Sequence, residues 1–310
     1  MYVAPLISAA LARGEAVVAL ESTVLTHGLP KPDNLELARS LERLVREGGA
    51  VPATVGIVKG NVVVGLSEDE LEYLSRVTAD KASLWNLASV MAGGQTAGTT
   101  VATTLYAAHR AGIRVFSTGG IGGVHPQPPG AQVVDESADL LALAQYPLLV
   151  VCSGAKSILN VEATVERLET LGIGVIGYQS DYFAGFYTPQ TRFAVAARLD
   201  RTAQIALAFK LQEWLGLKQA ILVSRPVSQG LAEHELADWL EQAGEEASQK
   251  GLKGKNLTPF LLARLAELSS GRSLEVNLRL LKENAALAAA LAGEVAKLAG
   301  HKADLLAPRL

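Results

Sequence analysis

Apolar residues occur along the chain in short unbroken runs that alternate with helical stripes. The run "LLVVC" at 148–152 has no polar position, which is typical of a strand buried on both faces of a sheet. After it, Ile158, Val161, Val165 and Leu168 recur at steps of three and four residues, which predicts a helix. The segment between them, "SGAK", is therefore expected to be the turn from a central strand into its crossover helix.

The same alternation is repeated along most of the chain. Two apolar runs on either side of Lys59-Gly60 indicate a β-hairpin, which makes one part of the sheet antiparallel. Ser67 followed by Glu70 is a capping box, which predicts the start of a helix. Strands are predicted at 16–20, 51–58, 61–66, 113–117, 148–152, 174–179 and 220–227, and helices at 6–13, 36–49, 67–77, 96–112, 135–145 and 200–216.

This order of elements predicts an α/β fold with three layers, α/β/α, a central mixed, mostly parallel sheet and a C-terminal helical cover. The chain becomes helix-rich at about 233–300. No Pro-rich segment, low-complexity run or internal repeat divides the sequence, so residues 1–310 are expected to form a single α/β domain. Hydrophobic residues make up 49% but aromatic residues only 5%, so the core must consist mainly of aliphatic side chains.

Charge, cysteine content and hydropathy argue against several classes of function. The chain has 28 Lys and Arg against 31 Asp and Glu, without a long run of one sign, so nucleic acid is not an expected partner. Cys152 is the only cysteine, which excludes an intrachain disulfide and fits a reducing compartment. No apolar run approaches the roughly 20 residues of a membrane helix, and the N-terminus has no basic region before its apolar part. We therefore expect a cytoplasmic protein without a membrane partner.

Polar residues follow several predicted strands at the point where each strand ends. Glu21 and Lys156 each follow a strand closely, and a glycine loop at 118–125 follows another, with Asp135 beyond it. In open α/β sheets these carboxyl ends meet at one edge, where ligands bind. Simpler interpretations stay open, because Glu21 could cap a turn, Asp135 could serve the N-terminus of the next helix, and a lysine in a turn is most often solvated.

The glycine loop "TGGIGGVH" does not match the known nucleotide-binding motifs. It lacks the spacing G-x-G-x-x-G, and G-x-x-x-x-G-K-[ST] does not occur in the chain. Backbone N–H groups of this loop, or of "TAGTT" at 96–100, could hold an anion, although a tight turn without ligand is the default interpretation of both. The histidines form no close pair with each other or with Cys152, so zinc is not expected. Asp135 would suit Mg²⁺ or Mn²⁺, which one aspartate alone does not establish.

Several motifs, taken together and in order, resemble one known family. They are "ALESTVLTHGLPKPDN", "GAVPATVGIVKG", "STGGIGGVH", "DESADL", "CSGAKSILN", "GYQS", "TPFLLARLAELSSG" and "EVNLRLLKENAALAA". From about Pro5 to Gly300 the chain thus resembles the pseudouridine-5'-phosphate glycosidase family, also called indigoidine synthase A-like. The resemblance implies a three-layer fold, a homotrimer and a divalent ion, typically Mn²⁺ with Mg²⁺ as the alternative. The implied activity is reversible cleavage of the carbon–carbon glycosidic bond of pseudouridine 5'-phosphate to uracil and ribose 5-phosphate.

The resemblance also implies roles for individual residues. Lys156 of "SGAK" matches the covalent nucleophile, Glu21 of "ALEST" the proton donor, and Asp135 of "DESAD" the metal ligand. The segment at 180–193 keeps an aromatic pair, Phe186-Tyr187, but its flanks depart from the family pattern, which leaves the details of a lid open. Residues that match substrate-binding positions, or lie in the matching glycine loop, are Lys81, Val101, Thr118, His125, Ser137, Ala138, Asp139 and Asn277.

The implied reaction explains why these residue types are needed. Because the leaving atom is carbon, protonation of a leaving heteroatom is not available and an electron sink is required. A neutral lysine can attack the anomeric carbon while an acid protonates the ring oxygen, which opens the sugar. The backbone of 96–100, with Lys81 or the metal beside it, is the predicted holder of the phosphate. Two alternatives stay open: a Schiff-base aldolase acting on another sugar phosphate, and a non-catalytic nucleotide-binding protein of the same fold.

Overall fold

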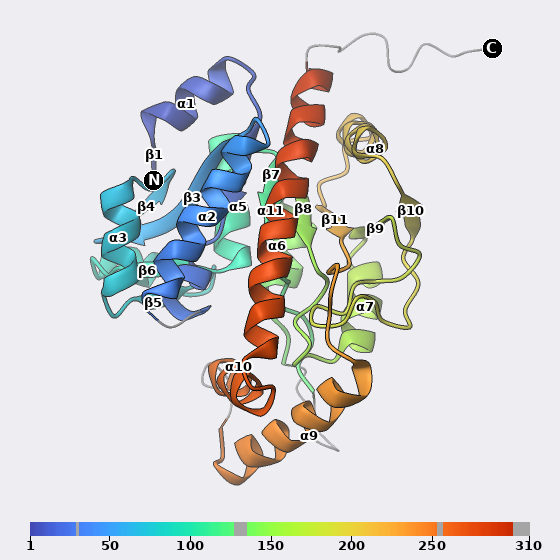
Figure 1. Ribbon diagram of the computed structural model, residues 1–310. Helices are drawn as coiled ribbons and strands as arrows, with labels where there is room; N and C mark the ends of the chain where they lie inside the picture. The colour runs from blue at the N-terminus through green and yellow to red at the C-terminus, as the bar shows by residue number, and fades with distance from the viewer. Residues whose placement is uncertain (29–30, 127–134, 253–256, 300–310) are drawn as a thin grey trace, which may run out of the picture.

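The computed structural model describes residues 1–28, 31–126, 135–252 and 257–299 (Figure 1). A mixed, mostly parallel sheet with helices on both faces forms its centre, which confirms the predicted three-layer α/β/α fold. The strands lie in the order β1-β4-β3-β2-β7-β8-β11-β9-β10, and β6, paired with β5, joins the sheet at β3. Their bounds are β1 Tyr2–Val3, β2 Val17–Leu20, β3 Val51–Val58, β4 Asn61–Val64, β5 Asp80–Ala82, β6 Ala97–Thr99, β7 Val115–Ser117, β8 Leu149–Cys152, β9 Gly174–Tyr178, β10 Ala197–Leu199 and β11 Ile221–Ser224.

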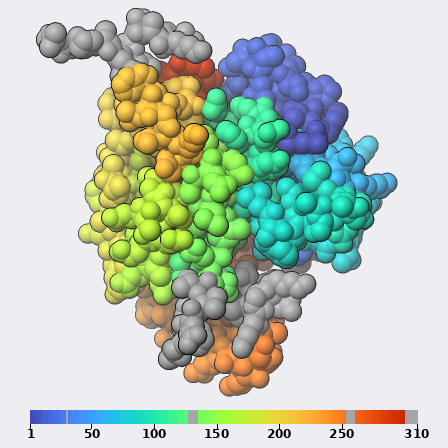
Figure 2. Space-filling model, turned by 180° about the vertical axis from the view of Figure 1, so that it is seen from behind, coloured from blue at the N-terminus to red at the C-terminus, as the bar shows by residue number. Residues whose placement is uncertain are grey.

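The helices form two layers on the sheet. Helices α2 and α11 pack together on one face, with α8 beside α11, whereas α5, α6 and α7 lie on the other face, which Figure 2 shows from behind. The bounds are α1 Pro5–Ala12, η1 Val24–Gly28 (a π-helix), α2 Asp33–Glu47, α3 Glu68–Arg76, α4 Leu87–Ala92, α5 Val101–Ala111, α6 Ala138–Gln145, α7 Val161–Thr170, α8 Thr202–Trp214, α9 Glu233–Gln249, α10 Leu257–Leu268 and α11 Arg272–Ala299. The predicted helix-rich part at 233–300 corresponds to α9, α10 and α11, but 253–256 and 300 lie outside the described residues.

The central strands are apolar and buried on both faces, as predicted. All residues of β2, β7, β8 and β11 are buried, which is the pattern of a parallel sheet between helix layers. Leu20 at the end of β2 pairs with Ser117 at the end of β7, and Ser117 pairs with Val151 of β8. The carboxyl ends of these three strands therefore meet at one edge of the sheet.

The predicted hairpin is present, and its turn explains the Lys59-Gly60 pair. Strands β3 and β4 pair antiparallel, with Lys59 at φ 47° and Gly60 at φ 78° between them. Two consecutive positive φ angles match a two-residue hairpin turn, whose twist fits that of the flanking strands. The capping box of Ser67 and Glu70 is also present at the start of α3.

Helix α11 is the largest part of the C-terminal cover and crosses the centre of the sheet (Figure 1). It contacts β2, β7 and β8, and its buried side includes Val276, Leu280 and Leu287. Its last turns lie near the amino ends of β2 and β7, so the helix runs against the direction of these strands. Its first turns therefore reach toward the carboxyl edge, where the predicted site residues gather.

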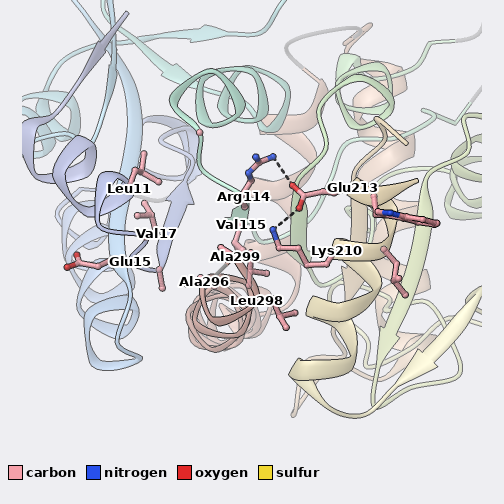
Figure 3. Close-up of a pocket in the computed structure, with 17 residues that line it drawn as sticks. Leu11, Glu15, Val17, Arg114, Val115, Lys210, Glu213, Ala296, Leu298 and Ala299 are labelled. Atoms are coloured by element: carbon pink, nitrogen blue, oxygen red, sulfur yellow. Dashed lines mark hydrogen bonds and ion pairs between the residues drawn. The ribbon is translucent and has the colours of Figure 1, made fainter. Parts of the chain in front are cut away.

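A cavity of about 510 Å³ lies at the opposite, amino-terminal edge of the sheet (Figure 3). Figure 3 shows Arg114 and Lys210 pointing toward Glu213, which binds both, at 2.9 and 2.8 Å. No residue predicted for the functional site lines this cavity, so its size is not a guide to the chemistry. None of the helices in the described ranges combines the length and apolarity needed to cross a membrane.

Candidate active site

Glu21 follows β2 directly, and two threonine hydroxyls hold its carboxyl group. Thr118 donates to Oε1, and the Thr23 hydroxyl lies 2.5 Å from Oε2 and 2.6 Å from the carbonyl oxygen of Thr99. A hydroxyl has one hydrogen and a carbonyl oxygen can only accept. The Thr23 hydroxyl can therefore donate to only one of these two oxygens at a time, and the two threonines together hold the Glu21 carboxyl group in place.

Lys156 lies in the turn after β8, as predicted, and neighbouring backbone fixes the shape of that turn. Its N–H donates to the carbonyl oxygen of Ile121 at 3.1 Å, in the glycine loop. Gly154 has φ 88°, and a Cβ there would lie 2.0 Å from the carbonyl oxygen of Ala184. Only glycine fits this position. The Lys156 side chain is half-buried.

Lys81 interacts with the charges of Lys156, Asp139 and Glu21. It lies on β5, which is several strands away from β8 in the sheet. Burial among surrounding groups lowers its pKa most, and the positive charge of Lys156 lowers it further, while Asp139 and Glu21 act in the opposite direction. Lys81 is nevertheless exposed to solvent, so it lies at the surface of the protein rather than in the core. These interactions bring four of the predicted residues together: Glu21, Lys81, Asp139 and Lys156.

Asp139 ties the glycine loop to two helices rather than pointing freely at a ligand. Its carboxylate is buried and accepts N–H groups from Gly122 at 2.8 Å and from Ala102 at 3.0 Å. Ala102 is in the first turn of α5, where a negative charge is favourable. Ser137, the N-cap of α6, accepts the N–H of Asp139 at 3.2 Å. The helix begins at Ala138, later than the predicted start at 135.

Close packing accounts for the glycines of the loop at 118–125. A Cβ on Gly120 would lie 2.5 Å from the ring of Phe186, and one on Gly123 would lie 2.3 Å from Oγ1 of Thr164. A Cβ on Gly122 would lie 2.3 Å from Oγ of Ser137. These contacts explain the glycines without a ligand, which agrees with the simpler of the two predicted interpretations.

The predicted phosphate holder at 96–100 is partly wrong. The N–H of Thr99 donates to Oγ of Ser22, and that of Thr100 donates to the carbonyl oxygen of Ala82, both at 3.0 Å. The next helical amide, Val101, precedes Ala102, which donates to Asp139. Because the first amides of a helix have no partner within it, the Val101 N–H is the donor left at this helix start among the described residues. The phosphate-binding groups at this helix start are therefore reduced to the N–H of Val101, together with Lys81.

The segment at 180–193 packs on the Lys156 turn. Phe186 donates its N–H to the carbonyl oxygen of Ser153 at 2.8 Å, and Ser157 donates its hydroxyl to the carbonyl oxygen of Gly185 at 2.9 Å. Phe186 and Tyr187 are both buried. This aromatic pair is thus a wall that supports the turn.

Three further predicted residues are Asp135, His125 and Asn277. Asp135 is exposed, and its carbonyl oxygen accepts the N–H of His125 at 2.8 Å. Asn277 lies half-buried in the first turns of α11. Within the described ranges, no group of three or more His, Cys, Asp or Glu could hold a metal ion. Glu136, next to Asp135, is bound by Arg167 through both oxygens.

Sequence reasoning missed two residues that organise this site. Thr23 and Asn284 both hold groups at the carboxyl edge, Thr23 at Glu21 and Asn284 at Thr118. Asn284 could have been found from the sequence, because this amide lies on the buried side of α11, where the helical pattern otherwise has apolar residues. For Thr23 no pattern in the sequence distinguishes it from an ordinary turn threonine.

Comparisons with known proteins agree on one family. The family model described as "Indigoidine synthase A like protein" matches residues 6–294. A protein of Thermus thermophilus named pseudouridine-5'-phosphate glycosidase is 55% identical over 278 residues, which cover 90% of this chain and 97% of that protein. One with the same name from Symbiobacterium thermophilum is 47% identical, covering 93% of this chain and 95% of the relative.

Two solved structures have the same fold. An indigoidine synthase A-like protein from Thermotoga maritima has a TM-score of 0.85 at 37% identity, covering 92% of this chain and 94% of its own. A prealnumycin C-glycosynthase in complex with ribulose 5-phosphate has a TM-score of 0.89 at 34% identity, covering 97% of this chain and 98% of its own.

Proposed function

The chain belongs to the indigoidine synthase A-like family, and from this premise we propose that it cleaves the carbon–carbon glycosidic bond of pseudouridine 5'-phosphate reversibly. The products are uracil and ribose 5-phosphate. The observation that carries the proposal is the placement of Glu21 and Lys156 at the carboxyl ends of β2 and β8, joined through the glycine loop after β7. The chain is also 55% identical to a protein named for this activity.

In the first step, Lys156 attacks the sugar while Glu21 acts as the acid. The lone pair of Nζ forms a bond to C1′, the bond from C1′ to the ring oxygen breaks, and this oxygen takes the proton of Glu21. The amine then gives up a proton to the Glu21 carboxylate, and the open sugar stays attached to Lys156. The hydrogen bonds from Thr118 and Thr23 orient the Glu21 carboxyl for this transfer.

In the second step, the nitrogen lone pair of Lys156 expels uracil. A C1′=N double bond forms, the bond from C1′ to C5 of uracil breaks, and C5 takes the electron pair and then the proton that Glu21 received from the amine. Water adds to the iminium and releases ribose 5-phosphate and the free lysine. Each step can run backward, so the same residues can join uracil to ribose 5-phosphate.

The 5'-phosphate is bound beside Lys81 at the start of α5. Lys81 supplies the charge and the Val101 N–H, at the start of α5, supplies a directed donor. The solved relative that holds ribulose 5-phosphate supports a pentose 5-phosphate as the ligand class. We assign Ser137 to Asp139 and Asn277 to substrate contacts on family resemblance, with His125 at the end of the glycine loop.

Asp135 is the proposed ligand of a divalent ion, Mn²⁺ or Mg²⁺. One carboxylate fits a hard ion that keeps water as most of its ligands, whereas the bidentate contact with Arg167 occupies Glu136. When bound, the ion supplies positive charge beside the anionic substrate. We further propose that the protein acts in the cytoplasm as a homotrimer, as the family resemblance implies.

Uracil release tests the proposed function against its alternatives. Purified protein with pseudouridine 5'-phosphate and Mn²⁺ is expected to produce uracil and ribose 5-phosphate in equal amounts, measured by chromatography. Lys156→Ala should abolish release, whereas Lys210→Ala, a lysine at the far edge of the sheet, should retain it. An aldolase of the same fold would release no uracil, and a binding protein would return the substrate intact.

A further inference from the structure

One buried amide in α11, Asn284, lies between the two loops that carry the reacting groups. Its side chain has no exposure to solvent. Nδ2 donates to the carbonyl oxygen of Thr118 at 2.9 Å and to Oγ of Ser153 at 3.1 Å, and lies 3.4 Å from the carbonyl oxygen of Gly119. Oγ of Ser153 also lies 3.3 Å from Oδ1. Both ends of the amide thus face these two loops.

Each loop leads directly to one of the groups that must react. Thr118 donates its own hydroxyl to Glu21, and Ser153 lies in the same turn as Lys156. The loops also contact each other, because the N–H of Ser153 donates to the carbonyl oxygen of Gly119 at 2.9 Å. Asn284 joins this pair to a helix that packs on β2, β7 and β8.

We propose that Asn284 is a positioning residue, which fixes the separation of Glu21 and Lys156 through Thr118 and Ser153. The inference rests on the proposed function, since these are the two groups that the reaction uses. Asn284 itself does not touch the reacting atoms. Because a misplacement of about 1 Å can cost roughly 100-fold in rate, loss of this amide is expected to lower turnover in protein that is still folded.

Asn34 in α2 provides a matched control. It is also buried, and its Nδ2 donates to the carbonyl oxygens of Leu25 in η1 at 2.8 Å and Ser75 in α3 at 3.2 Å, neither of which belongs to the loops that Asn284 binds. Replacing either amide by leucine leaves buried carbonyl groups unpaired, so both variants should lose stability. Only a positioning role predicts that the two variants differ in catalysis.

The test compares Asn284→Leu with Asn34→Leu below the melting temperature of both. Asn284→Leu is expected to lower kcat for uracil release by about 30- to 100-fold with KM within about 3-fold of wild type, and Asn34→Leu to keep both. Equal kcat in the two variants, or a loss seen only in KM, would overturn the proposal. If Asn284→Leu does not fold, Ser153→Ala removes one of the bonds, and an unchanged kcat in that variant would equally overturn it.

Hydrogen exchange separates this inference from the proposed function. Peptides that cover 118–125 and 153–159 should exchange faster in Asn284→Leu than in wild type, and at the wild-type rate in Asn34→Leu. Unchanged exchange in both loops of Asn284→Leu would overturn the positioning role whatever the enzyme does. Absence of uracil release by the wild type would instead overturn the proposed function.

Discussion

At the scale of residues, the site depends on neighbours that hold each functional group in place. Glu21 lies between two threonine hydroxyls, one of which can give its only hydrogen to a carbonyl oxygen. Sequence alone located Glu21 and Lys156 at strand ends, because an unbroken apolar run shows where a buried strand stops. It could not show Thr23 as a partner, since that contact depends on where β6 lies beside the end of β2.

Lys81 gives a prediction about pH. Burial and the charge of Lys156 lower its pKa, so Lys81 becomes neutral at a lower pH than a free lysine. A protonated Lys81 binds the phosphate, so KM for pseudouridine 5'-phosphate should be constant near neutral pH and rise as the solution becomes alkaline. In Lys81→Arg, which keeps its charge, this rise should be absent.

The control for this prediction is Lys81→Met. Removing a charged hydrogen bond should raise KM at neutral pH by tenfold or more and abolish its pH dependence. Steady-state kinetics at a series of pH values measures all three proteins. A wild-type KM in Lys81→Met would show that the phosphate is bound elsewhere.

At the scale of elements, the longer strands and helices follow their sequence patterns, and the short ones do not. The periodicity of α2, α5, α8 and α11 and the apolar runs of β2, β7 and β8 predicted these elements. Strands β1, β5, β6 and β10 have two or three residues each, too few for a period to show. Strand β7 is equally short, but it forms the end of the predicted strand at 113–117. This is why the position of Lys81 could not be predicted, because it depends on β5 pairing with β6.

The glycine loop gives a prediction about stability. In Gly122→Ala the new Cβ would lie 2.3 Å from Oγ of Ser137 and 2.7 Å from Oδ2 of Asp139, closer than atoms can pack. We expect a loss of about 1–3 kcal/mol in the free energy of unfolding, measured with denaturant, together with reduced activity.

Gly244→Ala is the matched control for that substitution. Gly244 lies within α9 with no atom within 4 Å of its added Cβ, so alanine should stabilise the helix by about 0.5–1 kcal/mol. Activity should not change. A Gly122→Ala protein as stable as wild type would show that the loop is not packed as described.

At the scale of the whole molecule, the sheet collects residues that are far apart in the chain. Glu21, Lys81, Asp139 and Lys156 interact at one edge, while the cavity of about 510 Å³ lies at the other. The gathering of strand-end residues at one edge could be expected from the α/β pattern, since parallel strands bring their carboxyl ends together. The hydrogen bonds from Asn284 of α11 to both loops could not be expected, because they depend on the direction in which that helix crosses the sheet.

The proposed homotrimer has a direct test in solution. Light scattering coupled to size exclusion should give a mass of three times the 32.5 kDa chain. Dilution to the concentration of the activity assay should leave this mass unchanged if the trimer is the active form. A mass of one chain with full uracil release would contradict the proposed assembly and leave the proposed activity in place.

The proposed reaction requires that Lys156 forms a covalent bond to the sugar, with Glu21 as the acid. It is tested by incubation with uracil and ribose 5-phosphate, reduction with borohydride and peptide mass spectrometry. We expect one added pentose phosphate on the peptide that contains Lys156, and none in Lys156→Ala. Modification at Lys81 instead, or full turnover by Lys156→Ala, would contradict it.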